Sequence, residues 1–87
     1  MFVIAFTRSA RKDIRAVPGD IQSRVLSAIQ ALADDPRPQG VKRLTGLDDL
    51  YRIRVGAYRV VYRVHDDQLE ILIIRVRHRR EVYRNLP

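Results

Sequence analysis

A run of alternating residues, LYRIRVGAYRVVYRV at residues 50–64, constrains the fold of this chain more than any other stretch. Aliphatic and tyrosine side chains alternate with arginines, and a period of two is typical of β-strands. Gly56-Ala57 interrupts the alternation as a two-residue turn with glycine in the first position. The run therefore predicts an antiparallel hairpin in which Arg54 lies directly opposite Arg59.

The two faces of this hairpin differ in character. One face carries arginines, and two like charges directly opposite each other repel, with Cβ atoms roughly 5 Å apart. Such a face favours an anionic partner, although a solvated surface is the ordinary alternative because antiparallel sheets often keep one face in water. The other face is apolar and is expected to pack against the core. It holds Tyr51, Ile53, Val55, Tyr58, Val60, Tyr62 and Val64.

The rest of the chain predicts further elements on both sides of the hairpin. Apolar residues recur at helical spacing after Thr7, and either Thr7 or Ser9 is a candidate N-cap. Pro18-Gly19 then separates this helix from a second one. The expected elements are a strand at residues 2–6, helices at about 7–17 and 20–32, and a last strand at about 70–77.

This order of elements predicts an α+β fold. We expect a mostly antiparallel four-stranded sheet with the two N-terminal helices on one face, because a chain of 87 residues supplies one helical layer. The expected order is strand, helix, helix and three-stranded meander, followed by a short C-terminal tail or helix. The helices would then cover the apolar face and leave the arginine face open.

The register of the last strand decides where its arginines lie. A two-residue turn after His65 would place Arg75 and Arg77 in the core, and burying unpaired charges is costly. We therefore expect a three-residue loop, which sets Arg59 opposite Arg75. In that register Arg79 also joins the open arginine face.

The positive charge is concentrated in the second part of the chain. The net charge is +7, and residues 51–87 hold nine arginines against four acidic residues, whereas residues 1–50 hold eight basic and six acidic residues. Arginine binds phosphate through paired hydrogen bonds and stacks on bases. The composition therefore favours a nucleic-acid partner, although an acidic protein or an anionic membrane would also match the charge.

Other kinds of site find little support in the sequence. The chain has no cysteine, His65 and His78 lie in different segments, and the glycines are scattered. We expect no metal and no cofactor. No apolar run is long enough to cross a membrane, and the N-terminus does not resemble a signal peptide. We therefore expect a cytoplasmic protein.

Metal-free cleavage of RNA is compatible with these residues. In that chemistry the ribose 2′-hydroxyl attacks the adjacent phosphate, and the protein must orient it, stabilise the added charge and move two protons. Arginine can orient and stabilise but stays protonated. Proton transfer would fall to Tyr83, to His78 or to the RNA itself, and packing of Tyr83 against the sheet edge is an equal alternative.

Three segments resemble the RelE branch of the RelE/ParE toxin superfamily: KRLTG (42–46), YRIRVGAYRVVY (51–62) and HRREVY (78–83). The similarity extends over nearly the whole chain, which we expect to form a single RelE-like toxin domain of residues 1–87. The resemblance implies a cytoplasmic toxin of a type II toxin–antitoxin pair, an mRNA interferase that cleaves mRNA in the ribosomal A site. The implied partners are the ribosome, mRNA and a cognate antitoxin, for which we expect an acidic, partly disordered segment; no membrane is expected.

The resemblance also assigns catalytic roles. The matching positions are Arg52 and Arg54 on the first hairpin strand, Arg59 on the second, Arg79 after the last strand, and Tyr83. Members of the family can carry lysines at the first two positions, and an arginine there is expected to hold the phosphate rather than act as base. Binding of RNA is expected of Arg63, Arg75, Arg77, His78 and Arg80.

Two other functions remain compatible with the sequence. The ParE branch shares the fold and much of the arginine pattern, and such a protein would inhibit DNA gyrase without cutting RNA. The third hypothesis is a non-catalytic basic module that binds an acidic partner. Tyr83 and the Arg54–Arg59 pair favour the ribonuclease.

Overall fold

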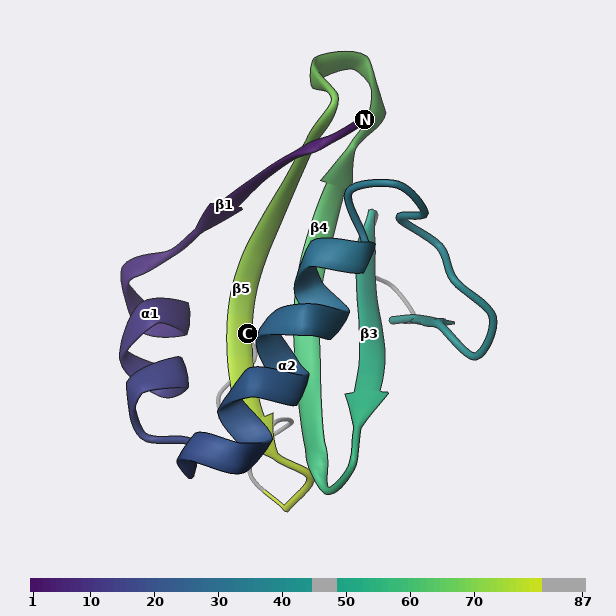
Figure 1. Cartoon of the computed structure of the whole chain (residues 1–87). Coiled ribbons are helices and arrows are strands. Elements are labelled where there is room, and N and C mark those ends of the chain that lie inside the picture. Colours follow the sequence, from purple (N-terminus) through teal and green to yellow (C-terminus); the bar gives the residue numbers. More distant parts are fainter. Residues whose placement is uncertain (45–48, 81–87) are drawn as a thin grey trace.

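A computed structural model of the protein describes residues 1–44 and 49–80. These residues form two α-helices and a twisted sheet (Figure 1). The expected C-terminal tail or helix lies outside the described residues. The elements are β1 (Val3–Phe6), α1 (Arg8–Arg15), α2 (Gly19–Ala31), β2 (Lys42–Arg43), β3 (Leu50–Val55), β4 (Tyr58–His65), the 3₁₀ turn η1 (Asp66–Gln68) and β5 (Glu70–His78).

The sheet has five strands in the order β1-β5-β4-β3-β2. β1 pairs with β5 in parallel, and the other three pairings are antiparallel. The α+β class and the largely antiparallel sheet are thus confirmed, but the prediction of four strands was wrong. The additional strand β2 pairs Lys42 with Arg52 and Arg43 with Tyr51. Two residues are too few to produce a recognisable alternation.

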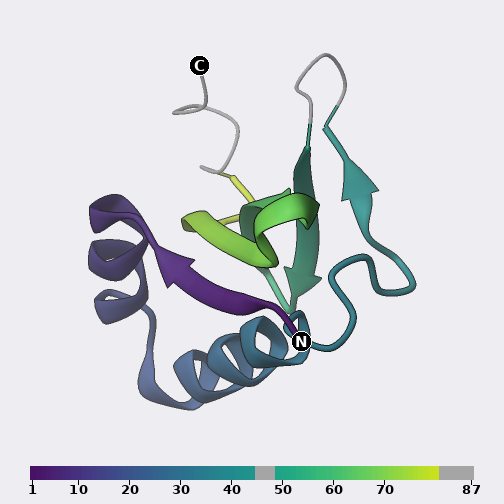
Figure 2. The same ribbon diagram turned by 90° about the horizontal axis from the view of Figure 1, so that it is seen from above.

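Both helices lie on the same face of the sheet, as expected (Figure 2). Thr7 is the N-cap of α1, where its hydroxyl accepts from the Ala10 amide at 3.0 Å and donates to the Ile74 carbonyl at 2.9 Å. The α1 helix is therefore bonded to β5 at its first turn. The apolar face of the hairpin packs with both helices in one core, which contains Ala10, Val17, Val25, Ile29, Leu32, Tyr51, Ile53, Val55, Val60, Tyr62, Val64, Ile71, Ile73 and Val76.

The hairpin of β3 and β4 has the predicted register. Arg54 pairs with Arg59, and Val55 pairs with Tyr58 across the turn. Gly56 has a φ of +59°, a left-handed conformation that favours glycine. The sequence alternation therefore describes this hairpin correctly.

The register of β5 differs from the prediction. His65 pairs with Glu70 across four connecting residues, and a β-bulge near Ile74 shifts the register by one residue between Tyr62 and Val61. Beyond the bulge Arg59 lies opposite Arg77, and the expected pairing of Arg59 with Arg75 was wrong. The longer connection and the bulge together keep apolar residues of β5 in the core on both sides of the shift.

The segment between α2 and β2 is fastened to the end of the sheet by side chains. Arg37 makes an ion pair with Asp66 in η1 at 2.7 Å and donates to the Tyr51 hydroxyl at 3.0 Å. The fully buried Tyr62 donates its hydroxyl to the Pro36 carbonyl at 2.7 Å. We refer to the contacts of Arg37, Asp66, Tyr51, Tyr62 and Pro36 as the loop clamp.

Neither helix in residues 1–44 and 49–80 has the length and apolar composition that a membrane crossing requires.

Candidate nucleic-acid interface

Three arginines stand in one row across the sheet, on the face opposite the helices. Arg54 of β3 pairs with Arg59 of β4, and Arg59 pairs with Arg77 of β5. Residues directly opposite each other on antiparallel strands point to the same face, with Cβ atoms roughly 5 Å apart. We call Arg54, Arg59 and Arg77 the arginine row.

Two further predicted site residues lie close to the arginine row. Burial lowers the pKa of Arg59 below its ordinary value, and the charges of Arg54, Arg52 and Arg79 lower it further. Burial also lowers the pKa of Arg52, with Arg54 as the second cause. The Arg79 amide donates to the Ala57 carbonyl in the hairpin turn at 2.7 Å. The structure thus brings together four of the five predicted catalytic positions.

Two of these arginines are less open than expected. Arg52 is 9% exposed and Arg59 is 8% exposed, whereas Arg54 and Arg79 are exposed. One terminal nitrogen of Arg59 donates to the carbonyls of Gly56 and Tyr58 at 3.1 and 3.0 Å. These neutral acceptors hold the guanidinium in place without cancelling its charge. The expectation of a fully open arginine face was therefore wrong for Arg52 and Arg59.

Arg75 does not join the arginine row. Its guanidinium reaches Asp13 of α1, with nitrogen–oxygen distances of 2.9 and 3.3 Å. The same carboxylate accepts from the Val76 amide at 2.9 Å. The bulge and the end of β1 leave this part of β5 facing α1. Arg75, which was predicted to bind RNA, instead forms an intramolecular ion pair with Asp13.

The remaining predicted residues lie at different distances from the row. Arg63 pairs with Leu50 and Leu72 and sits four residues along β4 from Arg59, about 13 Å away in an extended strand. His78 pairs with Tyr58, a residue of the helix-side face, and their rings meet edge to face at 5.7 Å. The described part of the chain therefore does not bring Arg63 or His78 into the row.

Two predicted residues follow β5. Arg80 is exposed, and its amide donates to Nδ1 of His78 at 3.3 Å. Tyr83 lies outside the described residues.

Asp13 has a role at the site that its sequence pattern did not predict. It joins α1 to β5 through Arg75 and Val76 and thereby fixes the end of β5 that carries Arg77. A signal was present, because Asp13 is the single carboxylate in the otherwise basic α1 segment RSARKDIR. Asp13 is partly buried in the fold, and a carboxylate that loses contact with water usually pairs with a cation, here a distant arginine.

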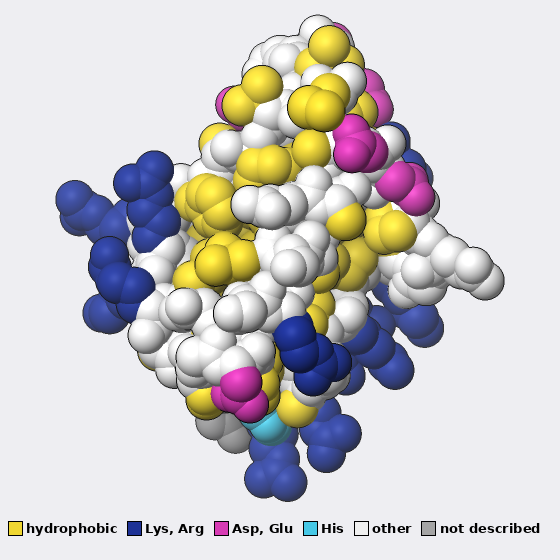
Figure 3. Space-filling model, in the orientation of Figure 1, with side chains coloured by type: hydrophobic (Ala, Val, Ile, Leu, Met, Phe, Trp, Pro, Cys, Tyr) yellow, Lys and Arg dark blue, Asp and Glu magenta, His cyan; other side chains and the backbone are white. Residues whose placement is uncertain are grey.

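The charge on the molecule is segregated by position. In Figure 3 the lysine and arginine side chains gather over α1 and around the end of the sheet that holds the hairpin turn. Most of the carboxylates in this view lie toward the other end, where the loop clamp joins the segment after α2 to η1. The acidic residues of that end include Asp34, Asp35, Asp49, Asp66, Asp67 and Glu70. Among residues 1–44 and 49–80, no group of three His, Cys, Asp or Glu side chains is arranged to hold a metal ion.

Comparison with known proteins identifies the family. A sequence model of the family described as "ParE toxin of type II toxin-antitoxin system, parDE" matches residues 4–83. Toxin RelG of Mycobacterium tuberculosis is 32% identical over 84 residues, which cover 95% of this chain and 97% of RelG. The mRNA interferase toxin RelE of Escherichia coli K12 is 29% identical over 86 residues, covering 94% of this chain and 90% of RelE.

A solved structure gives the same result. A chain in the crystal structure of the RelBE2 toxin–antitoxin complex of Mycobacterium tuberculosis superposes with a TM-score of 0.78 at 30% identity, covering 88% of this chain and 96% of that chain. This chain belongs to the RelE/ParE family of type II toxins, in which its named relatives are RelE and RelG toxins. The resemblance inferred from the sequence is thereby confirmed.

Proposed function

We propose that this protein is the toxin of a type II toxin–antitoxin pair and that it cleaves mRNA in the ribosomal A site. The observation that carries this proposal is the arginine row, with Arg52 and Arg79 beside it. Like-charged side chains held this close destabilise the free protein, and a bound polyanion offsets their repulsion. The relative from Escherichia coli that is named an mRNA interferase supports RNA as that polyanion.

The proposed reaction is attack of a ribose 2′-hydroxyl on the adjacent phosphate, which releases the 5′-oxygen of the next nucleotide. The arginine row binds the scissile phosphate through its non-bridging oxygens and holds it in line with the attacking oxygen. Its charges stabilise the extra negative charge of the pentacoordinate phosphorane. Arg52 and Arg59 are already desolvated, and two backbone carbonyls hold the Arg59 guanidinium in place, so little reorganisation is needed as that charge develops.

Proton transfer requires a group other than these arginines, because a guanidinium stays protonated. His78 is a poor candidate, since it pairs with Tyr58 of the helix-side face and its Nδ1 accepts the Arg80 amide. We assign removal of the 2′-hydroxyl proton to Tyr83, because Arg79, Arg80 and Arg84 lie near it in the sequence and would favour its phenolate. The departing 5′-oxygen takes a proton from water. Tyr83→Phe should then abolish most single-turnover cleavage while leaving ribosome binding unchanged, and full activity would remove Tyr83 from the chemistry.

The proposed partners are the ribosome with its mRNA and a cognate antitoxin. The matched RelBE2 structure is a toxin–antitoxin complex. For this chain we propose an antitoxin with an acidic, partly disordered segment that folds on the toxin and covers the arginine row.

A cell-free translation system tests the proposed activity. The purified chain should stop translation and cut a defined mRNA only when ribosomes are present, without added divalent metal for the chemistry itself. Primer extension would locate the cuts within the codon in the A site. Intact mRNA together with trapped gyrase–DNA complexes would instead identify a ParE-like inhibitor, and inactivity in both assays would favour a binding module.

A further inference from the structure

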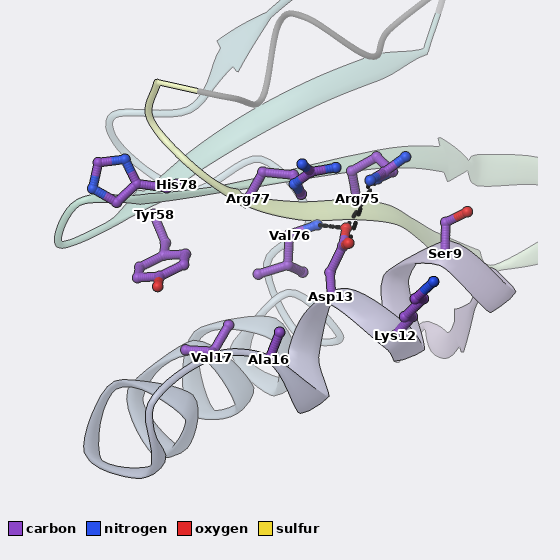
Figure 4. A pocket seen from close by; sticks show the side chains of 10 residues that line it. All are labelled: Ser9, Lys12, Asp13, Ala16, Val17, Tyr58, Arg75, Val76, Arg77 and His78. Atoms are coloured by element: carbon purple, nitrogen blue, oxygen red, sulfur yellow. Dashed lines mark hydrogen bonds and ion pairs between the residues drawn. The ribbon is translucent and has the colours of Figure 1, made fainter.

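A groove lies between α1 and the part of β5 that β1 does not cover. β1 pairs with β5 only as far as Ile73, and beyond that point α1 lies beside β5. The groove between them has a cavity volume of about 550 Å³. Figure 4 shows it opening between the strand and the helix, with side chains from both lining it.

The inner wall of this groove is apolar and partly aromatic. The Tyr58 ring and Val76 project from the sheet toward Ala16 and Val17, which follow α1 (Figure 4). The His78 ring stands edge-on to Tyr58, with an angle of 80° between the ring planes. Flat aromatic walls of this kind stack the bases of single-stranded nucleic acids with little sequence preference.

The rim of the groove is positively charged. Lys12, Arg75 and Arg77 line it together with a single carboxylate, Asp13. The oxygens of Asp13 already accept from Arg75 and from the Val76 amide. The carboxylate of Asp13 is therefore already engaged, and an anion that enters the groove meets the ammonium group of Lys12 on the helix side.

We propose that this groove binds one nucleotide of the RNA strand that is cleaved, with its base against Tyr58 and its phosphate at Lys12. This inference rests on the proposed function. Arg77 lines the groove and also lies opposite Arg59, so the groove continues directly from the arginine row. An acidic peptide would match the charge of the rim, whereas a nucleotide matches both the charge and the aromatic wall.

Binding of an uncleavable RNA tests the groove without a ribosome. The probe is a fluorescent oligouridine that is 2′-O-methylated throughout, so that the attacking hydroxyl is blocked. Lys12→Gln is expected to weaken binding about three- to tenfold and to reduce the slope of log affinity against log salt by about 0.7, the value for one phosphate contact on a single strand. The matched control is Arg11→Gln, which removes an equal charge from the neighbouring exposed position outside the groove and should change the slope much less.

The aromatic wall is tested with a second pair of variants. Tyr58→Leu removes the flat ring and should weaken binding about tenfold, a typical loss for one stacked base. Tyr58→Phe keeps the ring and should bind as the wild type does. Thermal unfolding checks that each variant is folded. If Tyr58→Leu is unfolded, the comparison of Lys12→Gln with Arg11→Gln decides whether RNA binds in the groove.

The outcomes separate the groove from the proposed activity. Equal affinities and salt slopes for the Lys12 and Arg11 variants would overturn the inference. A selective loss in Lys12→Gln would support it even if the cell-free test found no cleavage. Unchanged RNA binding combined with weaker binding of the antitoxin would make the groove a protein-docking surface and would also overturn the inference.

Discussion

Arg54 has opposite effects on stability and on the proposed activity. It is exposed, it lies directly opposite Arg59, and its charge lowers the pKa of both Arg52 and Arg59. In the free protein these charges repel one another. When a phosphate is bound, the same proximity supplies several donors to one anion. The residue most useful for binding a phosphorane is therefore expected to lower the stability of the free fold.

Arg54→Gln should separate these two effects. Loss of one charged donor to the transition state is expected to reduce single-turnover mRNA cleavage by about 10²–10³. Removal of a directly opposed like charge should raise the free energy of unfolding by about 0.2–1 kcal/mol. Urea denaturation at low and high salt measures the second effect, which should shrink as salt screens the repulsion.

Arg15→Gln is the matched control, because Arg15 is exposed on α1 and lies outside the row and the groove. It should leave both cleavage and stability nearly unchanged. Equal losses of cleavage in the two variants would mean that positive charge acts only as a general attractant.

The strands differ in how much of their structure the sequence determines. The β3–β4 hairpin was predicted residue by residue, because its alternation and its Gly56-Ala57 turn allow one register only. β5 was misplaced by two residues, because the connection after His65 is one residue longer than expected and a bulge adds one more residue without a sequence signal. β2 was missed because two residues have no period. These errors carried over to the site, where Arg77 instead of Arg75 completes the row. Burial of Arg52 and Arg59 depends on tertiary packing and is invisible in an alternating pattern.

The loop clamp should contribute to stability through Tyr62. Its hydroxyl is fully buried and donates to the Pro36 carbonyl, which connects the loop after α2 to β4. Tyr62→Phe removes the hydroxyl and leaves the Pro36 carbonyl without this hydrogen bond. The free energy of unfolding should fall by about 1–2 kcal/mol. Urea denaturation measures the change, and an unchanged midpoint would contradict a stabilising role.

The loop clamp should also make stability depend on acid. The hydrogen bond from Arg37 lowers the pKa of Asp66, so the folded state favours the ionised carboxylate. This contribution is present above the unfolded pKa, roughly 4 for aspartate, and is lost as the pH falls through the lower folded value. Wild type should therefore be more stable than Asp66→Asn at neutral pH, and the difference should vanish in strong acid. A difference that is constant with pH would exclude this linkage.

At the scale of the whole molecule, a net charge of +7 makes association with polyanions strongly dependent on salt. An antitoxin held by charge alone would be screened at physiological salt, where the Debye length is about 8 Å. The proposed partner should therefore bind through apolar contacts as well. These contacts would bury surface of the folded toxin and stabilise it.

Co-expression with the neighbouring gene tests this expectation. The two proteins should remain together in a pull-down at high salt, and the melting temperature of the toxin should rise in the complex. Complete dissociation at moderate salt would contradict the proposed antitoxin, as would a toxin that is harmless when expressed alone.

The separation of acidic and basic residues along the sheet has a consequence for how the protein approaches its target. β4 spans eight residues, about 26 Å in extended form, with the arginine row near one end and the carboxylates around η1 at the other. The molecule is therefore a permanent electric dipole as well as a cation. In the field above an RNA surface such a dipole experiences a torque, which turns the hairpin turn toward the phosphates before any contact forms. Correctly oriented encounters then become more frequent than random tumbling allows, and this gain is confined to the last Debye length of the approach.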